Sequence, residues 1–459
     1  MALASTLLSA VLAPWFAVPV PMPAVRAAVE PPPRETLAVV GVTVLTLDAE
    51  ERVLEDHTVV VSDGLIAAMG PSDELPAPEG AEVVDGAGRW LVPGLVEMHG
   101  HLPMPGGPAG FDDDVLMLYL ANGVTTVRGM LGHPSHLALR EEIAAGTRAG
   151  PRLFVGSPAM HGGLGLTPET AASQVAGHAA AGYDHLKVHE GLPPAVYAAI
   201  AEAADEHGIT FGGHVSDLVG LWDAVDAGQT TLDHMDNVVE ALLPEGAQPT
   251  SLAELASMAD RERLPEVAAR LAEADVAVVP THALWANLFG GASGDALRAR
   301  HPELAYLPKP MVDGWVGQAN AQSAQLGESG RGLLALRDEA LVALHEAGVP
   351  VLMGTDSPQL FSVPGFSMHR EMDALTEAGL SNAVVLDACT AAAARFYGED
   401  YAAGRVAPGL RADLLLLDAD PREDLDALAR PRAVLADGRR WSRERLDAEL
   451  ARIRDSRAP

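Results

Sequence analysis

The 459-residue sequence contains one cysteine, two lysines and few aromatic side chains. A single cysteine, Cys389, excludes an intramolecular disulfide and a cysteine-rich zinc cluster. It stands in the apolar run LDACTAAAARF, where we expect a small core residue rather than a nucleophile. Because aromatic residues make up only 4% of the chain, alanine, valine and leucine must provide most of the core packing.

Basic residues are also scarce. The chain has 31 of them against 63 acidic residues, a formal net charge of −32. This balance argues against a nucleic-acid surface, which requires clustered lysine and arginine, and it is silent about the fold. A solvated acidic surface explains it equally well. The two lysines are Lys187 and Lys309, so a lysine at a functional position suggests chemistry that arginine cannot perform.

The first 30 residues are apolar and carry no acidic side chain before Glu30. The segment AVRAA resembles a signal-peptide cleavage site, although no basic residue precedes the apolar stretch. We therefore expect an export leader in residues 1–30 and a secreted or periplasmic protein. The alternative is a disordered extension on a cytoplasmic protein. Four prolines in this segment oppose a membrane-spanning helix, and we expect no span elsewhere.

Both ends of the chain have the pattern of short β-strands. Residues 36–92 contain valine-rich runs separated by Asp-Gly and Gly turns, and residues 404–459 contain similar runs. The simplest arrangement pairs the two ends in one accessory β-sandwich domain.

Between these ends, residues 93–403 alternate short apolar strands with alanine-rich helices, which is typical of βα units around a parallel sheet. Eight such units predict a (β/α)₈ TIM barrel. The predicted strands are at 91–101, 124–130, 152–157, 183–190, 209–215, 230–235, 276–282 and 349–356. We expect residues 284–335 to form a lid-like insertion whose Trp285, Phe289 and Trp315 make an apolar cover.

Polar side chains end several of the predicted barrel strands. His99 and His101 are two positions apart on the first strand, so both imidazoles can point to the same face. The other residues of this kind are Lys187, His214, His234 and Asp356, on strands four, five, six and eight. Any one of them alone could be a hydrogen-bonded core residue. Because active sites of TIM barrels lie at the carboxyl ends of the strands, the set together predicts a metal centre there.

These segments closely resemble the amidohydrolase superfamily. The matching segments, in order, are PGLVEMHGHL, DHLKVHEGLP, GGHV, LDHM and GTDSP, and the C-terminal CTAAAARFYG and GRVAPGLRADLLLLDADP are similar to the family's return into its accessory domain. The resemblance covers residues 37–425. It is strongest for the branch of imidazolonepropionase-like proteins, prolidase-like dipeptidases and carboxypeptidases, and ochratoxin-type amide hydrolases.

The resemblance implies two divalent cations, with zinc favoured because the ligands are imidazoles and carboxylates without thiolates. His99, His101 and Asp356 would hold the more buried cation, and His214 and His234 the more exposed one. Lys187, carbamylated by CO₂, would bridge them; an unmodified Lys187 paired with Asp356 is the alternative. Asp356 would also be the catalytic proton acceptor and donor.

Three further residues are candidates for substrate binding. His161 follows the third strand and His282 ends the seventh, so either could stabilise an oxyanion or serve a structural role. Arg128 ends the second strand and could bind a substrate carboxylate, although a structural salt bridge explains it better. His189 alternates with Lys187 and could support the ligands from behind.

We therefore expect a hydrolase that cleaves an amide or peptide C–N bond in a small molecule. The favoured substrates are dipeptides or N-acyl amino acids, including ochratoxin-like aryl amides. A cyclic amidase of the imidazolonepropionase type is the close alternative, and a catalytically silent binding protein on the same fold is the alternative of another class. Assembly into a homo-oligomer is left open.

Overall fold

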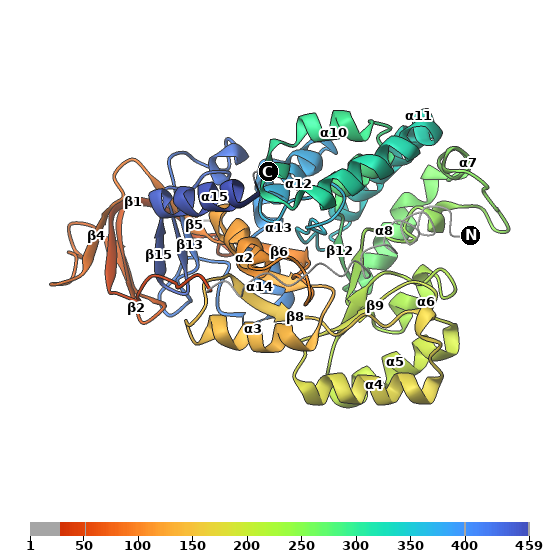
Figure 1. Ribbon diagram of the computed structural model, residues 1–459, viewed down its shortest axis with the longest axis horizontal. Helices are drawn as coiled ribbons and strands as arrows, with labels where there is room; N and C mark the ends of the chain where they lie inside the picture. Colours follow the sequence, from red (N-terminus) through yellow and green to blue (C-terminus); the bar gives the residue numbers. More distant parts are fainter. Residues whose placement is uncertain (1–27, 51, 399–400, 458–459) are drawn as a thin grey trace.

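The computed structural model describes residues 28–50, 52–398 and 401–457, without the side chains of 324–328. It confirms the predicted fold class: a (β/α)₈ barrel joined to a β-sandwich domain that is built from both ends of the chain. In Figure 1 the first strands and the last strands lie together at one end of the molecule. The predicted leader falls outside the described residues, apart from 28–30.

The terminal domain is an eight-stranded sheet that joins the two ends of the chain. Its strands are β1 (Leu37–Leu45), β2 (Val53–Ser62), β3 (Leu65–Pro71), β4 (Glu82–Asp85), β5 (Trp90–Pro93), β13 (Leu414–Leu417), β14 (Ala433–Ala436) and β15 (Arg439–Ser442). The junction is the antiparallel pairing of β5 with β13. Alternate apolar side chains of these strands enclose a core of their own, separate from the core of the barrel.

Two Asp-Gly turns explain the register of this domain. Asp63-Gly64 joins β2 to β3, and Asp437-Gly438 joins β14 to β15. All four residues have positive φ angles, between 53° and 83°, as a two-residue type I′ hairpin requires. The two turns also pack on each other, because a Cβ on Gly438 would lie 2.6 Å from the Cα of Gly64.

The barrel strands form where the sequence predicts them. Seven are regular: β6 (Leu95–Gly100), β7 (Val124–Gly129), β8 (Arg152–Val155), β9 (Leu186–Val188), β10 (Phe211–Gly213), β11 (Thr231–Asp233) and β12 (Ala277–Val279). The eighth is an irregular segment at 351–357, which bridges β12 through Val351 and β6 through Ser357. A parallel bridge from Gly156 to His185 joins β8 to β9, so the ring is closed.

Helices surround this ring. They are α2 (Phe111–Ala121), α3 (Pro134–Ala144), α4 (Pro168–Ala181), α5 (Pro194–His207), α6 (Leu221–Asp226), α7 (Leu252–Met258), α8 (Leu264–Glu273), α9 (His282–Phe289), α10 (Gly294–Arg300), α11 (Lys309–Glu346), α12 (Phe366–Glu377), α13 (Asn382–Ala388) and α14 (Ala391–Tyr397). Local sequence sets their ends. For example, α4 starts with a capping box at Thr167 followed by Pro168, and it stops at Gly182, whose φ is 84°. In the described part of the chain, no helix combines the length and apolarity needed to cross a bilayer.

The segment 284–335 is helical. It contains most of α9, all of α10 and the first part of the 38-residue α11, so its predicted end falls inside a continuous helix. Trp285, Phe289 and Trp315 are buried in the main core and do not form an exposed cover. A lid-like role for this segment stays a prediction.

The C-terminal helix α15 (Arg443–Arg457) directly follows β15, the last strand of the terminal domain. It packs on α2 of the barrel, and both Arg452 and Arg457 pair with the buried carboxylate of Asp114. The end of the chain is thereby tied to the barrel.

Close packing of the eighth strand against the first generates one prediction. A Cβ on Gly354 would lie 2.4 Å from Cγ1 of Val279 and 2.9 Å from the backbone nitrogen of His99. Gly354→Ala should therefore push the eighth strand away from β6, lowering the free energy of unfolding by about 1–3 kcal/mol. Chemical denaturation measures this change.

The matched control is Gly317→Ala, since Gly317 is in α11 and has open space around its Cα. Alanine there should be neutral or stabilising by up to about 1 kcal/mol. Equal effects of the two substitutions would contradict the packing argument.

Candidate metal centre

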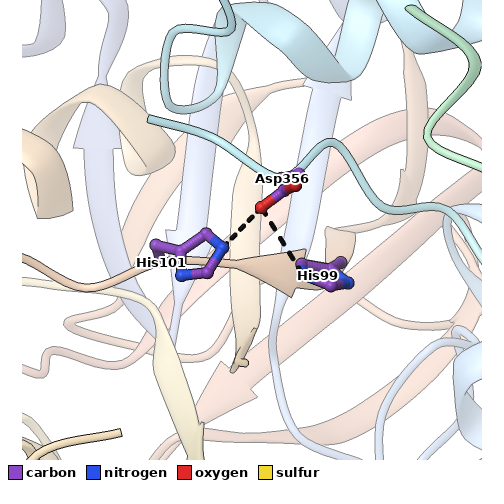
Figure 2. Close-up of side chains that lie close together, drawn as sticks. All are labelled: His99, His101 and Asp356. Carbon is purple, nitrogen blue, oxygen red and sulfur yellow. Dashed lines mark hydrogen bonds and ion pairs between the residues drawn. The ribbon is translucent and has the colours of Figure 1, made fainter. Parts of the chain in front are cut away.

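His99 and His101 meet Asp356 at the carboxyl end of the barrel. His99 lies near the end of β6 and His101 directly follows the strand. Their imidazoles face the same side, with ring centroids 5.5 Å apart. One carboxylate oxygen of Asp356 lies 3.5 Å from Nε2 of His99 and is hydrogen-bonded to Nε2 of His101 (Figure 2). The three potential ligand atoms lie within 4.8 Å of one another, close enough to share one cation.

His214 and His234 extend this cluster. The ring of His234 lies 4.6 Å from that of His99 and 4.5 Å from that of His214, so the three imidazoles form a row. Nε2 of His234 lies 3.9 Å from the second carboxylate oxygen of Asp356. The fold thus brings together all five histidine and aspartate side chains that the sequence predicts as ligands.

Lys187 is in the middle of β9 and is buried. Its side chain runs along Gly213 of the neighbouring strand, where an added Cβ would lie 2.8 Å from its Cδ and 3.1 Å from its Nζ. Glycine at 213 therefore leaves the space that the lysine occupies. Among the residues that the structure describes, no ion pair of Lys187 within 4.0 Å forms, although the charges of Asp233 and Asp356 act on its ammonium; the alternative pairing with Asp356 stays a prediction. Burial lowers the pKa of the Lys187 ammonium and favours the neutral amine.

The protonation states suit cation binding. Burial lowers the pKa of His99, His214 and His234 well below the usual histidine value, so these imidazoles are neutral at physiological pH, as metal ligands must be. Nε2 of His234 is buried and has no hydrogen-bond partner among the described residues, whereas its Nδ1 bonds to the Thr281 hydroxyl at 2.8 Å. A buried nitrogen lone pair directed at a carboxylate and further imidazoles fits a divalent cation.

Two carboxylates that the sequence analysis did not select hold the imidazoles from behind. Asp233 Oδ2 lies 2.8 Å from Nδ1 of His99, and Asp236 Oδ2 is hydrogen-bonded to Nδ1 of His214 at 2.7 Å. Each contact fixes the ring orientation and leaves Nε2 for a cation. The segment LDHMD contains both aspartates, and proximity to His234 was the available clue.

The alternation of side chains along a strand did not predict that Asp233 faces the centre. Neighbouring residues on a strand point to opposite faces, so Asp233 and His234 are not expected to face the same centre. They do so because His234 has a φ of 62°, which ends the strand with a left-handed residue. Thr281 (φ 50°) and Asp356 (φ 58°) form similar corners after their strands. Non-glycine residues in this region are strained, and here the strain aims side chains into the centre.

Glu97 supports the centre from inside the barrel. Its buried carboxylate accepts hydrogen bonds from the backbone of His99 and from both the backbone and hydroxyl of Thr355. Burial raises the pKa of Glu97 to about 8. This carboxyl group joins the first and eighth strands next to their ligand residues.

A second group of potential ligand atoms adjoins the first and shares His214. It consists of Glu190, His214 and Asp236, whose atoms lie within 4.8 Å of one another. The ring of His189 packs 4.1 Å from that of His214, on the same side as Glu190. His189 therefore contacts a predicted ligand directly, in keeping with its expected supporting place.

The three candidates for substrate binding have different surroundings. His161 caps a short 3₁₀ helix by accepting from the backbone of Gly163 and is partly exposed. His282 is buried against α11, with Nε2 3.5 Å from Asp338. Within the described part of the chain, neither hydrogen-bonds, pairs or stacks with a predicted metal ligand.

Arg128 is buried inside the barrel. Its guanidinium donates to the Thr231 hydroxyl and lies 4.0 Å from Asp233. This surrounding favours the structural salt bridge over a substrate contact. The guanidinium stands behind the carboxylate that holds His99.

Comparison with known proteins agrees with this geometry. The sequence profile of the amidohydrolase family matches residues 90–440. The chain belongs to the amidohydrolase family. Membership identifies this amidohydrolase as a hydrolase of carbon–nitrogen bonds, and its cluster of imidazoles and carboxylates has the residue types that divalent metals bind.

Individual relatives cover most of the amidohydrolase. An imidazolonepropionase from Rubrobacter xylanophilus is 29% identical over 384 residues, 81% of this chain and 86% of that enzyme. The solved structure of a bottromycin amidohydrolase superposes with a TM-score of 0.73 at 25% identity, covering 93% of this chain and 91% of that one. A structure described as a prolidase from Bifidobacterium longum gives 0.65 at 27% identity, covering 92% and 100%.

The carboxylate behind His214 generates a prediction about cation affinity. Asp236→Asn replaces the carboxyl group that orients the His214 ring, so the affinity for zinc should fall about 10- to 100-fold. Competition with a chromophoric chelator measures this affinity. The control Asp226→Asn changes an exposed aspartate that pairs with Arg270 and should leave it unchanged. Unaltered zinc affinity in Asp236→Asn would show that Asp236 does not support a ligand.

Proposed function

We propose that this amidohydrolase cleaves the amide bond of dipeptides or N-acyl amino acids, including ochratoxin-like aryl amides, at a centre for two divalent cations. His99, His101 and Asp356 would hold one cation, and His214 and His234 the other, with carbamylated Lys187 between them. Zinc suits these nitrogen and oxygen ligands. The observation that carries the proposal is the convergence of His99, His101 and His234 on Asp356.

The bound cations would supply Lewis-acid polarisation of the scissile carbonyl and a lower pKa for water. The chain's own residues would do the rest. Asp356 has both carboxylate oxygens turned to imidazoles of the centre and would accept a proton from the attacking water, then pass it to the leaving nitrogen. Asp233 and Asp236 would keep the imidazoles in one tautomer throughout.

The relatives support two substrate classes. The prolidase-like and bottromycin amidohydrolase structures favour an open-chain peptide or amide. The imidazolonepropionase relative, matched over most of its length, favours a cyclic amide as the second candidate. Lys187 inclines the choice to the open-chain class, since a bridging carbamate belongs to two-metal centres. A panel of Xaa-Pro dipeptides, N-acyl amino acids, ochratoxin and imidazolonepropionate separates the two by kcat/KM.

Asp356→Asn tests the proton-transfer role. Loss of the basic carboxylate should lower kcat on the best substrate of the panel by about 10²- to 10⁴-fold while the fold is retained. Steady-state kinetics and circular dichroism measure both, and metal analysis separates a lost proton acceptor from a lost cation. Asp205→Asn, on the exposed face of α5, is the control. A near-normal rate in Asp356→Asn would refute the assigned role.

The two lysines make the carbamate testable. Only a neutral amine adds CO₂, with loss of one proton, and burial favours that form at Lys187. Protein equilibrated with ¹³C-bicarbonate and zinc should give a carbamate resonance in the ¹³C NMR spectrum that Lys187→Arg removes. Lys309 is exposed and paired with Asp313, so Lys309→Arg should keep the resonance. A spectrum without the resonance, or one that Lys187→Arg leaves intact, would exclude the bridging carbamate.

Metal analysis addresses the silent-scaffold alternative. Negligible bound zinc, together with no hydrolysis of any panel substrate after addition of zinc or manganese, would favour a binding protein over an enzyme.

A further inference from the structure

A cavity lies at the amino ends of the barrel strands, on the opposite side of the barrel from the metal centre. It is lined by the start of β8, by α3 and by the strands β14 and β15 of the terminal domain, and its volume is about 390 Å³. Its lining residues come from both domains. The metal ligands do not contribute to it.

Arginines dominate the lining of this cavity, although the chain as a whole carries a net charge of −32. The six arginines are Arg34, Arg140, Arg148, Arg152, Arg411 and Arg439. Guanidinium groups gathered at one place repel one another unless carboxylates, water or a bound anion compensate their charge.

Two of the arginines have carboxylate partners of their own. Arg140 pairs with Asp184 at 2.8 Å and Arg148 pairs with Asp113 at 2.8 Å. Arg140 also lies 3.3 Å from Glu141, and Arg148 lies 3.5 Å from Asp112 and 3.2 Å from Glu142, so carboxylates outnumber arginines on that side of the cavity.

On the other side, the positive charge is in excess. Arg411 pairs with Asp413 at 3.0 Å. Asp437 is shared, since Arg34 binds it directly while Arg411 and Arg439 lie 3.7 and 4.0 Å away. The four arginines at 34, 152, 411 and 439 thus face two lining carboxylates, which leaves a surplus of two positive charges.

Arg152 is the most informative residue of this group. Its Nη1 donates to the Tyr401 carbonyl at 2.8 Å, and its guanidinium stacks 4.7 Å above the ring of Phe154. Among the described residues it forms no ion pair with a carboxylate. Burial and the nearby charge of Arg411 both lower the pKa of Arg152, as expected for two guanidinium groups that repel each other.

We propose that this interdomain cavity binds a small dianion, an oxyanion or compact dicarboxylate, through Arg152 of the barrel and Arg439 of the terminal domain. The planar guanidinium group matches phosphate, sulfate and carboxylate oxygens in pairs. A dianion cancels the surplus of two charges and joins the two domains across their interface. This site is independent of the proposed hydrolase function, because it shares no residue with the metal centre.

The experiment is titration of the full-length, metal-loaded protein by calorimetry in buffer free of phosphate and sulfate, at constant ionic strength set with sodium chloride. Inorganic phosphate, sulfate and succinate are the separate probes. At least one should bind saturably and raise the melting temperature by a few degrees at saturation. Tighter phosphate or sulfate identifies an oxyanion site, and tighter succinate identifies a dicarboxylate site.

Variants locate the binding. Arg152→Gln and Arg439→Gln should each weaken it at least tenfold, and Arg152→Lys, which keeps the charge but not the planar guanidinium, should restore only part of it. The control is Arg432→Gln, which changes an exposed arginine paired with Asp418 outside the cavity. Circular dichroism checks folding, and Arg439→Gln decides the question if Arg152→Gln does not fold. No saturable binding by any probe, or equal binding by wild type and a folded Arg439→Gln, would overturn the proposal.

Discussion

The imidazole of His99 lies between two buried carboxylates, and the centre of this protein depends on that arrangement. Asp233 meets one ring nitrogen at 2.8 Å, and Asp356 faces the other at 3.5 Å. Moving the ring away would separate it from both buried carboxylates, whose charge is costly to leave uncompensated in a medium of low polarity. His101, directly after the first strand, and His234, directly after the sixth, reach the same Asp356. One aspartate thereby joins the first, sixth and eighth strands of the barrel.

Local strain and burial serve this arrangement together. His234, Thr281 and Asp356 have left-handed backbone conformations directly after their strands, and the surrounding barrel compensates for that cost through packing and hydrogen bonds. Burial also lowers the pKa of His99, His214 and His234 and that of the Lys187 ammonium, which favours their neutral forms. The site therefore offers nitrogen and carboxylate lone pairs at one point, where a bound cation would supply positive charge. Membership in the amidohydrolase family agrees with that electrostatic character.

The two ends of the barrel differ in charge. The carboxyl ends of the strands gather neutral imidazoles and carboxylates, whereas the amino ends adjoin an arginine-lined cavity against the terminal domain. Both are built from residues that are distant in sequence. Arg439, for example, donates to the carbonyl of Pro32 near the other end of the chain. The terminal domain therefore contributes charged side chains of its own to its interface with the barrel.

The sequence by itself determined the fold class, the eight barrel strands and the residues expected at their ends, because alternation and strand–helix periodicity are local properties that a single chain displays. It also contained the Asp-Gly turns that set the terminal hairpins. It did not reveal Asp233 or Asp236 as supports of the imidazoles, nor α15, nor the continuity of α11 through the predicted insertion. Only the tertiary structure decided these. The left-handed backbone at His234 turns its side chain to the face opposite the one that strand alternation assigns. Contacts such as that of Asp114 with Arg457 join residues more than three hundred positions apart.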